Sequence, residues 1–204
     1  MSGTLFIVSA ASGTGKTTLV KALRENCTRL GVSISHTTRS IRPGELNGVH
    51  YHFVTQAQFI EMIGNGEFLE HAEVFGNYYG TARASVEQAL QQDQDIILEI
   101  DWQGAQQVRQ LYPHAVSVFI MPPSREALRQ RLQNRGQDSE AVITQRLNGA
   151  IADMSHFIEF DYLVINDDFD TALDELRSIV QSARLRQSVQ VIRHSTRIEG
   201  LLSV

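Results

Sequence analysis

Short apolar runs alternate along the chain with segments that have the period of a helix. Residues 5–9, 95–100, 116–121 and 162–165 have the length and composition of buried strands. The expected helices begin at Lys16, near Ala84, after Asp101, at Ser124, near Ser139 and at Asp170. Apolar strands that alternate with helices are typical of a parallel sheet covered by helices. The pattern therefore predicts an α/β fold.

Two stretches interrupt this alternation. Residues 33–82 contain turn signals such as Pro43-Gly44 between short aromatic-rich runs, so we expect a small, mostly β subdomain inserted there. Residues 125–160 are rich in arginine and glutamine, and they contain an apolar helical stripe formed by Ile143, Leu147, Ile151, Met154 and Ile158. We expect a single domain, 1–204, with a core made of 1–32, 83–124 and 161–204. The tail from Ser188 is weakly patterned.

The composition is that of an ordinary globular protein. The chain has 204 residues, of which 42% are hydrophobic and 20% charged, so it can bury one full core. No segment approaches the ~20 apolar residues that span a bilayer, and the first apolar run is too short for a secretory signal. A net charge of −5 argues against broad nucleic-acid binding. We expect a cytoplasmic protein without a membrane or nucleic-acid partner.

The single cysteine, Cys27, excludes an internal disulfide. It is in helical register with Leu19, Leu23 and Leu30. A thiol at such a position is typical of a packed core rather than of a nucleophile. We therefore assign no chemistry to Cys27.

A glycine-rich segment follows the first predicted strand and precedes the first predicted helix. Its residues are Ala10, Ala11, Ser12, Gly13, Thr14, Gly15, Lys16 and Thr17. Such a loop turns backbone N–H groups toward a phosphate, while the lysine reaches the outer phosphates and the threonine hydroxyl can bind Mg²⁺. The segment predicts a nucleoside triphosphate site. The usual pattern begins with glycine where Ala10 stands, and alanine fits there if its φ is negative.

Carboxylates end the strand predicted at 95–100. Glu99 and Asp101 are two positions apart, so a strand would direct both to the same face, where they could support Mg²⁺ directly or through water. The segment from Asp101 to Gly104 also spells the D-x-x-G of switch GTPases. That alternative is weak, because the chain lacks an Asn-Lys-x-Asp motif to read guanine.

Arginines are frequent in both insertions, and forked guanidinium groups can hold phosphate. Arg39 and Arg42 stand in a predicted loop and Arg135 stands beside Gly136, which makes them better candidates for phosphate binding than Arg129 and Arg131. A solvated helix face is the better interpretation of those two. Arg146 lies at the edge of the apolar stripe and could lean toward a cleft.

Several long motifs occur together and in order. They are the phosphate loop, SHTTRSIRPGELNGVHY at 35–51, FLEHAEVFGNYYGT at 68–81, IDWQG at 100–104 and RGQDSE at 135–140. This set resembles guanylate kinase over about residues 4–186. The chain departs from the family pattern at Ala10-Ala11, in place of glycine or proline, and at Glu99, where aspartate is common.

The resemblance implies a role for each motif. Insertion 33–82 would be the GMP-binding subdomain and insertion 125–160 a helical lid. The residues that would read guanine are Ser35, Glu70, Thr81 and Asp101. Those that would hold the GMP phosphate are Arg39, Arg42, Tyr51 and Tyr79. Without the motif, Glu70 would be taken for a solvated acid, and the two tyrosines could equally be packing aromatics.

The implied reaction is in-line transfer of the γ-phosphoryl group from ATP to GMP, which needs alignment and charge neutralisation rather than a covalent intermediate. ATP would lie on the phosphate loop, with Mg²⁺ held by Thr17 and supported by Glu99 and Asp101. The catalytic residues would be Lys16, Arg39, Arg135 and Arg146.

Two alternatives remain on the residues alone. A kinase for another nucleoside monophosphate would share the loop and the lid, although Glu70 with Ser35 and Thr81 favours guanine. A non-catalytic protein-binding module would share the fold, although the intact Lys16 and Thr17 favour an enzyme. A homo-oligomer is neither indicated nor excluded.

Overall fold

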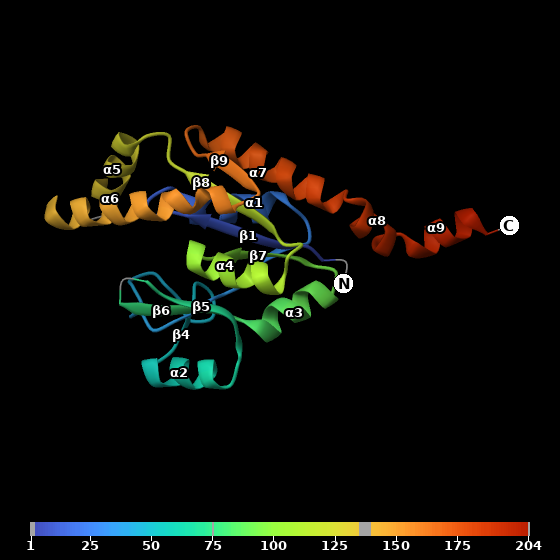
Figure 1. The fold of residues 1–204 in the computed structure, drawn as a ribbon, viewed down its shortest axis with the longest axis horizontal. Coiled ribbons are helices and arrows are strands. Elements are labelled where there is room, and N and C mark those ends of the chain that lie inside the picture. The colour runs from blue at the N-terminus through green and yellow to red at the C-terminus, as the bar shows by residue number, and fades with distance from the viewer. Residues whose placement is uncertain (1–2, 75, 135–139, 204) are drawn as a thin grey trace.

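The computed structural model describes residues 3–74, 76–134 and 140–203. Its centre is a five-stranded parallel sheet with the strand order β2-β7-β1-β8-β9 (Figure 1). The strands are β1 (Leu5–Ala10), β2 (Leu30–Val32), β7 (Asp95–Glu99), β8 (Val116–Met121) and β9 (Tyr162–Ile165). The α/β fold expected from the sequence is confirmed.

Alternate residues of β1 face the two sides of the sheet, and each side is covered by helices. Phe6 and Val8 pack against one layer, and Leu5 and Ile7 against the other. The first layer consists of α1 (Lys16–Asn26) and α7 (Phe169–Arg184), and the second of α3 (Arg83–Gln91) and α4 (Trp102–Leu111). Burial on both faces explains why this strand reads as a continuous apolar run.

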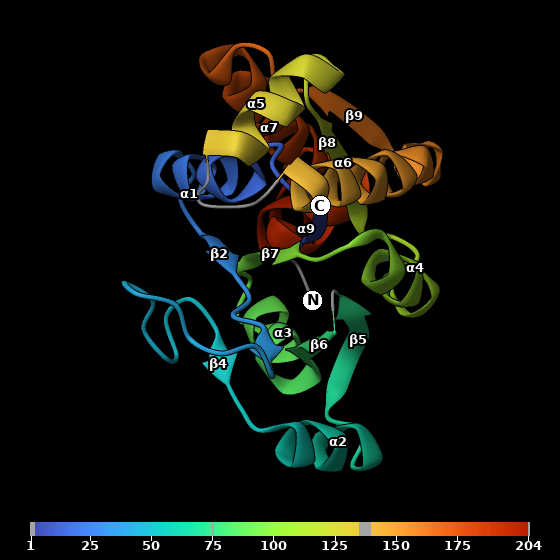
Figure 2. The same cartoon turned by 90° about the vertical axis from the view of Figure 1, so that its left-hand side faces the viewer.

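A second, smaller sheet lies beside α4, away from the main sheet (Figure 2). Its strands are β3 (His36–Thr37), β4 (His52–Phe53), β5 (Phe68–Val74) and β6 (Asn77–Ala82), in the order β4-β3-β6-β5, and the helix α2 (Gln56–Gly64) joins β4 to β5. Phe59 of α2 stacks on Phe68 and Tyr78, which gives this sheet an aromatic core of its own.

Two helices cover the phosphate loop. They are α5 (Arg125–Asn134) and α6 (Glu140–Met154), and the short 3₁₀ helix η1 (Ser155–Glu159) follows α6. Leu128, Leu132 and Ala150 form a small apolar cluster with Ala11 of the loop. This cluster holds the helices of the second insertion against the core.

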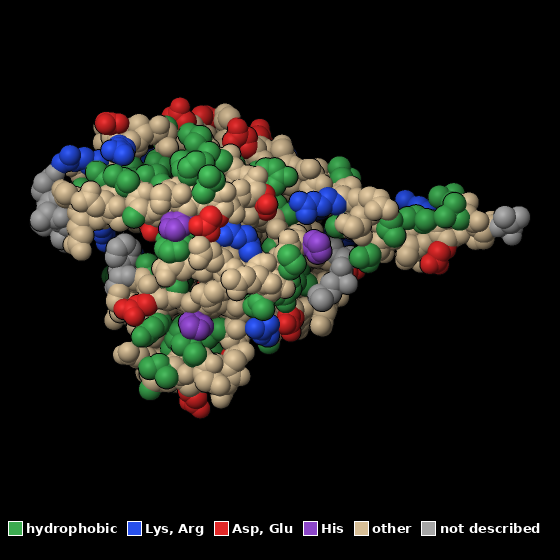
Figure 3. Space-filling view, in the orientation of Figure 1, with side chains coloured by type: hydrophobic (Ala, Val, Ile, Leu, Met, Phe, Trp, Pro, Cys, Tyr) green, Lys and Arg blue, Asp and Glu red, His purple; other side chains and the backbone are tan. Residues whose placement is uncertain are grey.

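The chain ends in two helices that project from the body, α8 (Gln187–Arg193) and α9 (Ser195–Leu202) (Figure 1). Hydrophobic side chains remain visible along this projection (Figure 3). Throughout the described residues, no helix combines the length and the apolar character needed to cross a membrane.

Two expectations from the apolar pattern are wrong. The helix α1 ends at Asn26, and Arg29, with a φ of 58°, turns the chain so that Leu30 begins strand β2 instead of continuing the helix. Cys27 still packs beside the core, as expected, although it follows the helix. Ile158 does not extend the stripe on α6, because it lies in η1 and is 80% exposed.

A buried carboxylate fastens the amino end of β7 to two distant segments. Asp95 is 1% exposed, and its oxygens accept hydrogen bonds from the Thr4 amide (2.7 Å) and from Nε of Arg184 (2.7 Å). Arg184 also donates to the carbonyl of Thr28 at 2.7 Å. The end of α7 is thereby tied to the strands β1 and β7.

We expect Asp95→Ala to lower the free energy of unfolding by about 3–5 kcal/mol, because it leaves a guanidinium and an amide buried without their partner. Asp174→Ala is the matched control, since it breaks the exposed ion pair with Arg177 and should cost less than about 1 kcal/mol. Urea unfolding of both variants measures the difference. Equal losses would contradict this account of Asp95.

Candidate active site

The glycine-rich loop connects β1 to α1 in a conformation that needs glycine. Gly13 and Gly15 have φ angles of 90° and 95°, where other residues are strained. A Cβ on Gly15 would also lie 2.6 Å from Nδ2 of Asn166. Ala10 ends β1 and does not have a positive φ, so alanine fits at this position as expected.

Two side chains from distant parts of the chain donate hydrogen bonds to the same carbonyl of this loop. The Thr14 carbonyl accepts hydrogen bonds from Nδ2 of Asn166 (2.6 Å) and Nη1 of Arg131 (3.1 Å). Arg131 also donates to the carbonyl of Asn166 at 3.0 Å. The interpretation of Arg131 as a solvated surface residue is therefore wrong. Asn166 was not predicted, although it directly follows β9 at the carboxyl edge of the sheet, where ligand-binding groups gather.

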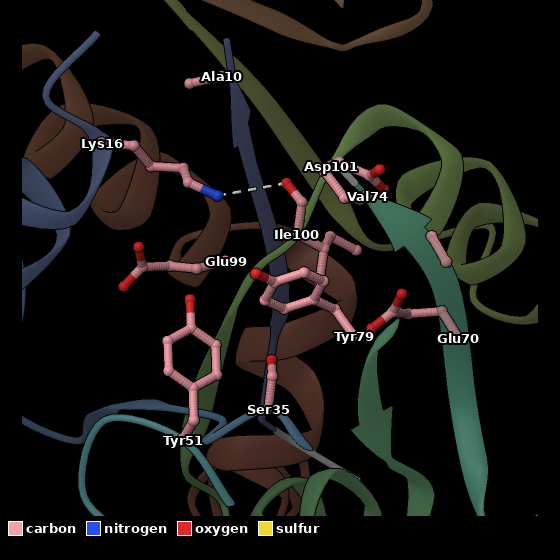
Figure 4. Close-up of a pocket in the computed structure, with 11 residues that line it drawn as sticks. Ala10, Lys16, Ser35, Tyr51, Glu70, Val74, Tyr79, Glu99, Ile100 and Asp101 are labelled. Carbon is pink, nitrogen blue, oxygen red and sulfur yellow. Dashed lines mark hydrogen bonds between the residues drawn. The ribbon is translucent and has the colours of Figure 1, made fainter. Parts of the chain in front are cut away.

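The Lys16 side chain runs from the start of α1 to the carboxyl end of β7. Its Nζ donates to the carbonyl of Ile100 at 3.4 Å (Figure 4). Burial lowers the pKa of this amine, and the negative charges of Glu99, Asp101 and Glu70 oppose the shift. The lysine is thus a cation directed into a region rich in carboxylates.

The two carboxylates at the end of β7 have different partners. Glu99 accepts a hydrogen bond from the Thr17 hydroxyl at 3.1 Å. Asp101 lies beyond the end of the strand and caps α4, where it accepts from the Gly104 amide at 2.9 Å. Paired oxygens such as those of Thr17 and Glu99 are suitable ligands for Mg²⁺. Among the residues that the structure describes, no three His, Cys, Asp or Glu side chains are grouped to hold a metal by themselves.

Glu70 is a buried carboxylate on β5, an edge strand of the smaller sheet. It is 3% exposed and stands opposite Thr81, whose buried hydroxyl makes no hydrogen bond of normal geometry to the described part of the chain. Burial raises the pKa of Glu70 to about 7, against the influence of the neighbouring Thr81 side chain and amide. Its Oε2 occupies the space that a Cβ on Gly104 would need, so only glycine fits there unless the carboxylate moves.

Eight of the predicted site residues line one pocket between the main sheet and the smaller sheet (Figure 4). These residues are Ala10, Lys16, Ser35, Tyr51, Glu70, Tyr79, Glu99 and Asp101. Ala72, Val74 and Ile100 complete the lining and were not predicted. Figure 4 shows the carboxylate of Glu70 across the pocket from Lys16.

The two arginines of the first insertion are not part of this lining. Arg39 forms an ion pair with Glu45 (2.7 Å), and the hydrogen bond to this partner is the main cause that raises the pKa of Arg39. Its guanidinium also lies 5.4 Å from the ring centre of Tyr51, so it stands beside the pocket. Arg42 is exposed, and its backbone amide donates to the same glutamate at 2.8 Å.

Two arginines of the second insertion, Arg129 and Arg146, lie on different helices. Arg146 is half-buried on α6, and Arg129 is exposed on α5. Arg135 lies outside the described residues. The structure therefore leaves the expected joint action of Arg135 and Arg146 untested.

The arrangement combines a phosphate-binding loop, a half-buried lysine and a buried carboxylate in one cleft. The family model that describes guanylate kinase matches residues 2–183. A guanylate kinase of Acinetobacter baylyi is 57% identical over 203 residues, which are 100% of this chain and 98% of that protein. A guanylate kinase of Escherichia coli K12 is 56% identical and covers 98% of each chain.

A solved structure has the same architecture. The crystal structure of guanylate kinase from Anaplasma phagocytophilum superposes with a TM-score of 0.77 at 35% identity, and the match covers 91% of this chain and 88% of that one. These similarities extend over the main sheet and both insertions. The chain therefore belongs to the guanylate kinase family, the ATP:GMP phosphotransferases.

Proposed function

We propose that the chain performs this phosphoryl transfer with ATP on loop 10–17 and GMP in the neighbouring pocket. The observation that carries the assignment is that Lys16, at the start of α1, and Glu70, in β5 of the smaller sheet, line the same pocket. Residues 33–82 would act as the GMP-binding subdomain and residues 125–160 as the lid. The remaining segments, 1–32, 83–124 and 161–204, form the core of the single domain in this proposal.

Guanine suits the part of the pocket at the buried Glu70. Its N1–H and N2–H₂ groups form a pair of donors that the Glu70 carboxylate can accept together. Ser35 has a hydroxyl in the pocket lining and can donate to the guanine O6. Thr81 lies outside this lining, with its hydroxyl buried next to Glu70, so its role in reading the base rests on the motif. Asp101, which also lines the pocket, would accept from the remaining amino hydrogen.

The GMP phosphate would bind beside the two tyrosines of the pocket lining. Tyr51 and Tyr79 lie with their ring centres 5.9 Å apart and can donate hydrogen bonds from their hydroxyls. Arg39 stands against Tyr51 and Arg42 lies in the adjoining loop, so both can supply positive charge. In this assignment Glu45 holds Arg39 in position.

Transfer then requires the two anionic substrates to be aligned and their repulsion to be reduced. Lys16 would contact the outer phosphates of ATP, and Arg135 and Arg146 would approach them from the lid. Thr17 and Glu99 have the oxygen atoms that Mg²⁺ prefers and would hold the ion, which supplies charge neutralisation at the phosphates. Closure of the lid would exclude water that could hydrolyse ATP.

Replacement of Lys16 tests the triphosphate site. We expect Lys16→Met to lower kcat by at least about 10²–10³-fold, because a positioned cation on the reacting phosphate is lost. Affinity for GMP should change little, since GMP would bind elsewhere. Lys21→Met, on the exposed face of the same helix, is the control. Steady-state kinetics and calorimetric GMP titration measure both quantities, and wild-type turnover in folded Lys16→Met would refute the assignment.

Replacement of Glu70 tests the choice of base. Glu70→Gln keeps the shape but replaces one acceptor oxygen with a donor, so the ratio of kcat/KM for GMP to that for AMP should fall sharply. A site built to pair with missing donors can discriminate by roughly 10⁴–10⁵. Glu73→Gln, an exposed change on the same strand, should leave the ratio unchanged. If the ratio is the same in both variants, guanine is read by other residues.

The raised pKa of Glu70 predicts a pH dependence of GMP binding. The ionised carboxylate is the form that accepts from guanine, and with a pKa of about 7 this form becomes the minority as the pH falls. Affinity should therefore decrease about tenfold from pH 8 to pH 6 through this group alone. Calorimetric titration of wild type and Glu70→Gln separates the effect, since ionisation of the GMP phosphate is common to both. Parallel pH curves would contradict the prediction.

A further inference from the structure

Helix α4 is joined to the end of the lid by side chains from one of its faces. Trp102, Gln106 and Arg109 all contact the segment 153–159, which comprises the end of α6 and the 3₁₀ helix η1. Positions three and four apart share a helix face, so these contacts form a row along α4. The first residue in this row, Trp102, directly follows the pocket residue Asp101.

Trp102 makes the contact nearest to the pocket. Its Nε1 donates a hydrogen bond to Oδ1 of Asp153 at 3.2 Å. Its ring lies flat on the imidazole of His156, with 3.5 Å between the ring centres and 5° between the planes. The stack therefore restrains the face of the indole, and the hydrogen bond restrains its edge.

The rest of the row keeps His156 in place. Glu159 contacts Nδ1 of His156 at 2.7 Å and accepts hydrogen bonds from Gln106 at 2.9 Å and Arg109 at 2.7 Å. Figure 3 shows histidine, acidic and basic side chains next to one another between α6 and α4. This polar cluster immobilises the surface on which the indole stacks.

Helix α6, whose end contacts Trp102, also carries Arg146, the proposed lid arginine. Arg146 precedes Asp153 by about two helical turns, or about 10 Å, so the two residues lie on the same face of α6. Between them, Ala150 packs against the apolar cluster next to the phosphate loop. A shift at Asp153 would therefore tilt α6 and move Arg146.

We propose that Trp102 is a positioning residue for phosphoryl transfer: through Asp153 and His156 it joins the helix capped by Asp101 to the lid helix that carries Arg146. The inference rests on the proposed function, in which Asp101 contacts GMP and Arg146 reaches the phosphates. Occupation of the guanine site and alignment of the lid arginine would then share one mechanical support. Trp102 itself would not contact either substrate.

Kinetics of Trp102→Phe test the proposal. The variant keeps an aromatic ring but loses the hydrogen bond to Asp153 and part of the stack, so kcat should fall about tenfold, the equivalent of about 1.4 kcal/mol. KM for GMP should change by less than about threefold, because the pocket lining is intact. Tyr112→Phe is the control, because it also removes one polar group from an aromatic side chain. Tyr112 lies at the opposite end of α4 from Trp102, so this variant should keep wild-type kcat.

A conservative change at the partner separates positioning from general destabilisation. Asp153→Asn retains an oxygen that can accept from the indole and should keep most of kcat, whereas Asp153→Ala should match Trp102→Phe. Thermal unfolding of all variants verifies that they are folded at the assay temperature. Equal kcat values in Asp153→Asn and Asp153→Ala would overturn the proposal.

A double-mutant cycle with Arg146→Ala tests whether Trp102 acts through Arg146. If Trp102 acts through Arg146, Trp102→Phe should lower kcat about tenfold in wild type but less than about twofold in Arg146→Ala. Fully additive losses would overturn the inference and leave the lid assignment intact. Wild-type kcat in Arg146→Ala would instead refute the lid assignment, and the inference with it.

Trp102 is the only tryptophan of the chain, so its fluorescence reports the contact directly. Asp153→Ala should make the indole more accessible to acrylamide, and joint binding of GMP and a non-hydrolysable ATP analogue should change the emission of wild type more than that of this variant. Identical quenching and identical nucleotide responses in the two proteins would contradict the proposed support.

Discussion

The position of the site depends on the register of the parallel strands around β1. This strand pairs with β7 on one side and β8 on the other, with Val8 opposite Glu99 and Ala10 opposite Ile120. The phosphate loop, Glu99 at the end of β7 and Asp101 just after it therefore lie at the same edge of the sheet. A shift of one residue in this register would turn the apolar side chains of β1 to the wrong layers, so the core and the site are specified together.

The charged groups near this edge of the main sheet offset one another's loss of hydration. Lys16 loses hydration in the interior, but Glu99, Asp101 and Glu70 surround its amine with negative charge. Glu70 is held in the smaller sheet, where burial raises its pKa to about 7. Each group is therefore kept in an environment that bound substrate would complement, since phosphate suits the lysine and a pair of N–H donors suits the carboxylate. This difference between the lysine and the carboxylate supports the proposed placement of the ATP phosphates at Lys16 and of guanine at Glu70.

The sequence predicted features that depend on local pattern. Continuous apolar runs identified β1, β7, β8 and β9, and the glycines located the phosphate loop. Strand β2 was missed because Leu30–Val32 is too short to show a period and contains glycine. The clamp of Arg131 and Asn166 on Thr14 was missed for another reason: these residues are far apart in sequence, and only the assembled sheet and lid bring them together. Glu70 could be singled out only by its surrounding motif, since an isolated glutamate gives no sign of burial.

The close approach of Glu70 to Gly104 has an evolutionary consequence. The atom that a Cβ at position 104 would meet is the tip of a flexible side chain, which can rotate away at little cost to the fold. A mutation to alanine would thus be tolerated by folding but would redirect the carboxylate that faces the pocket. Positions 70 and 104 are expected to vary together among relatives that bind another base, and glycine should persist wherever glutamate does. Selection at this glycine would then act through substrate choice rather than through stability.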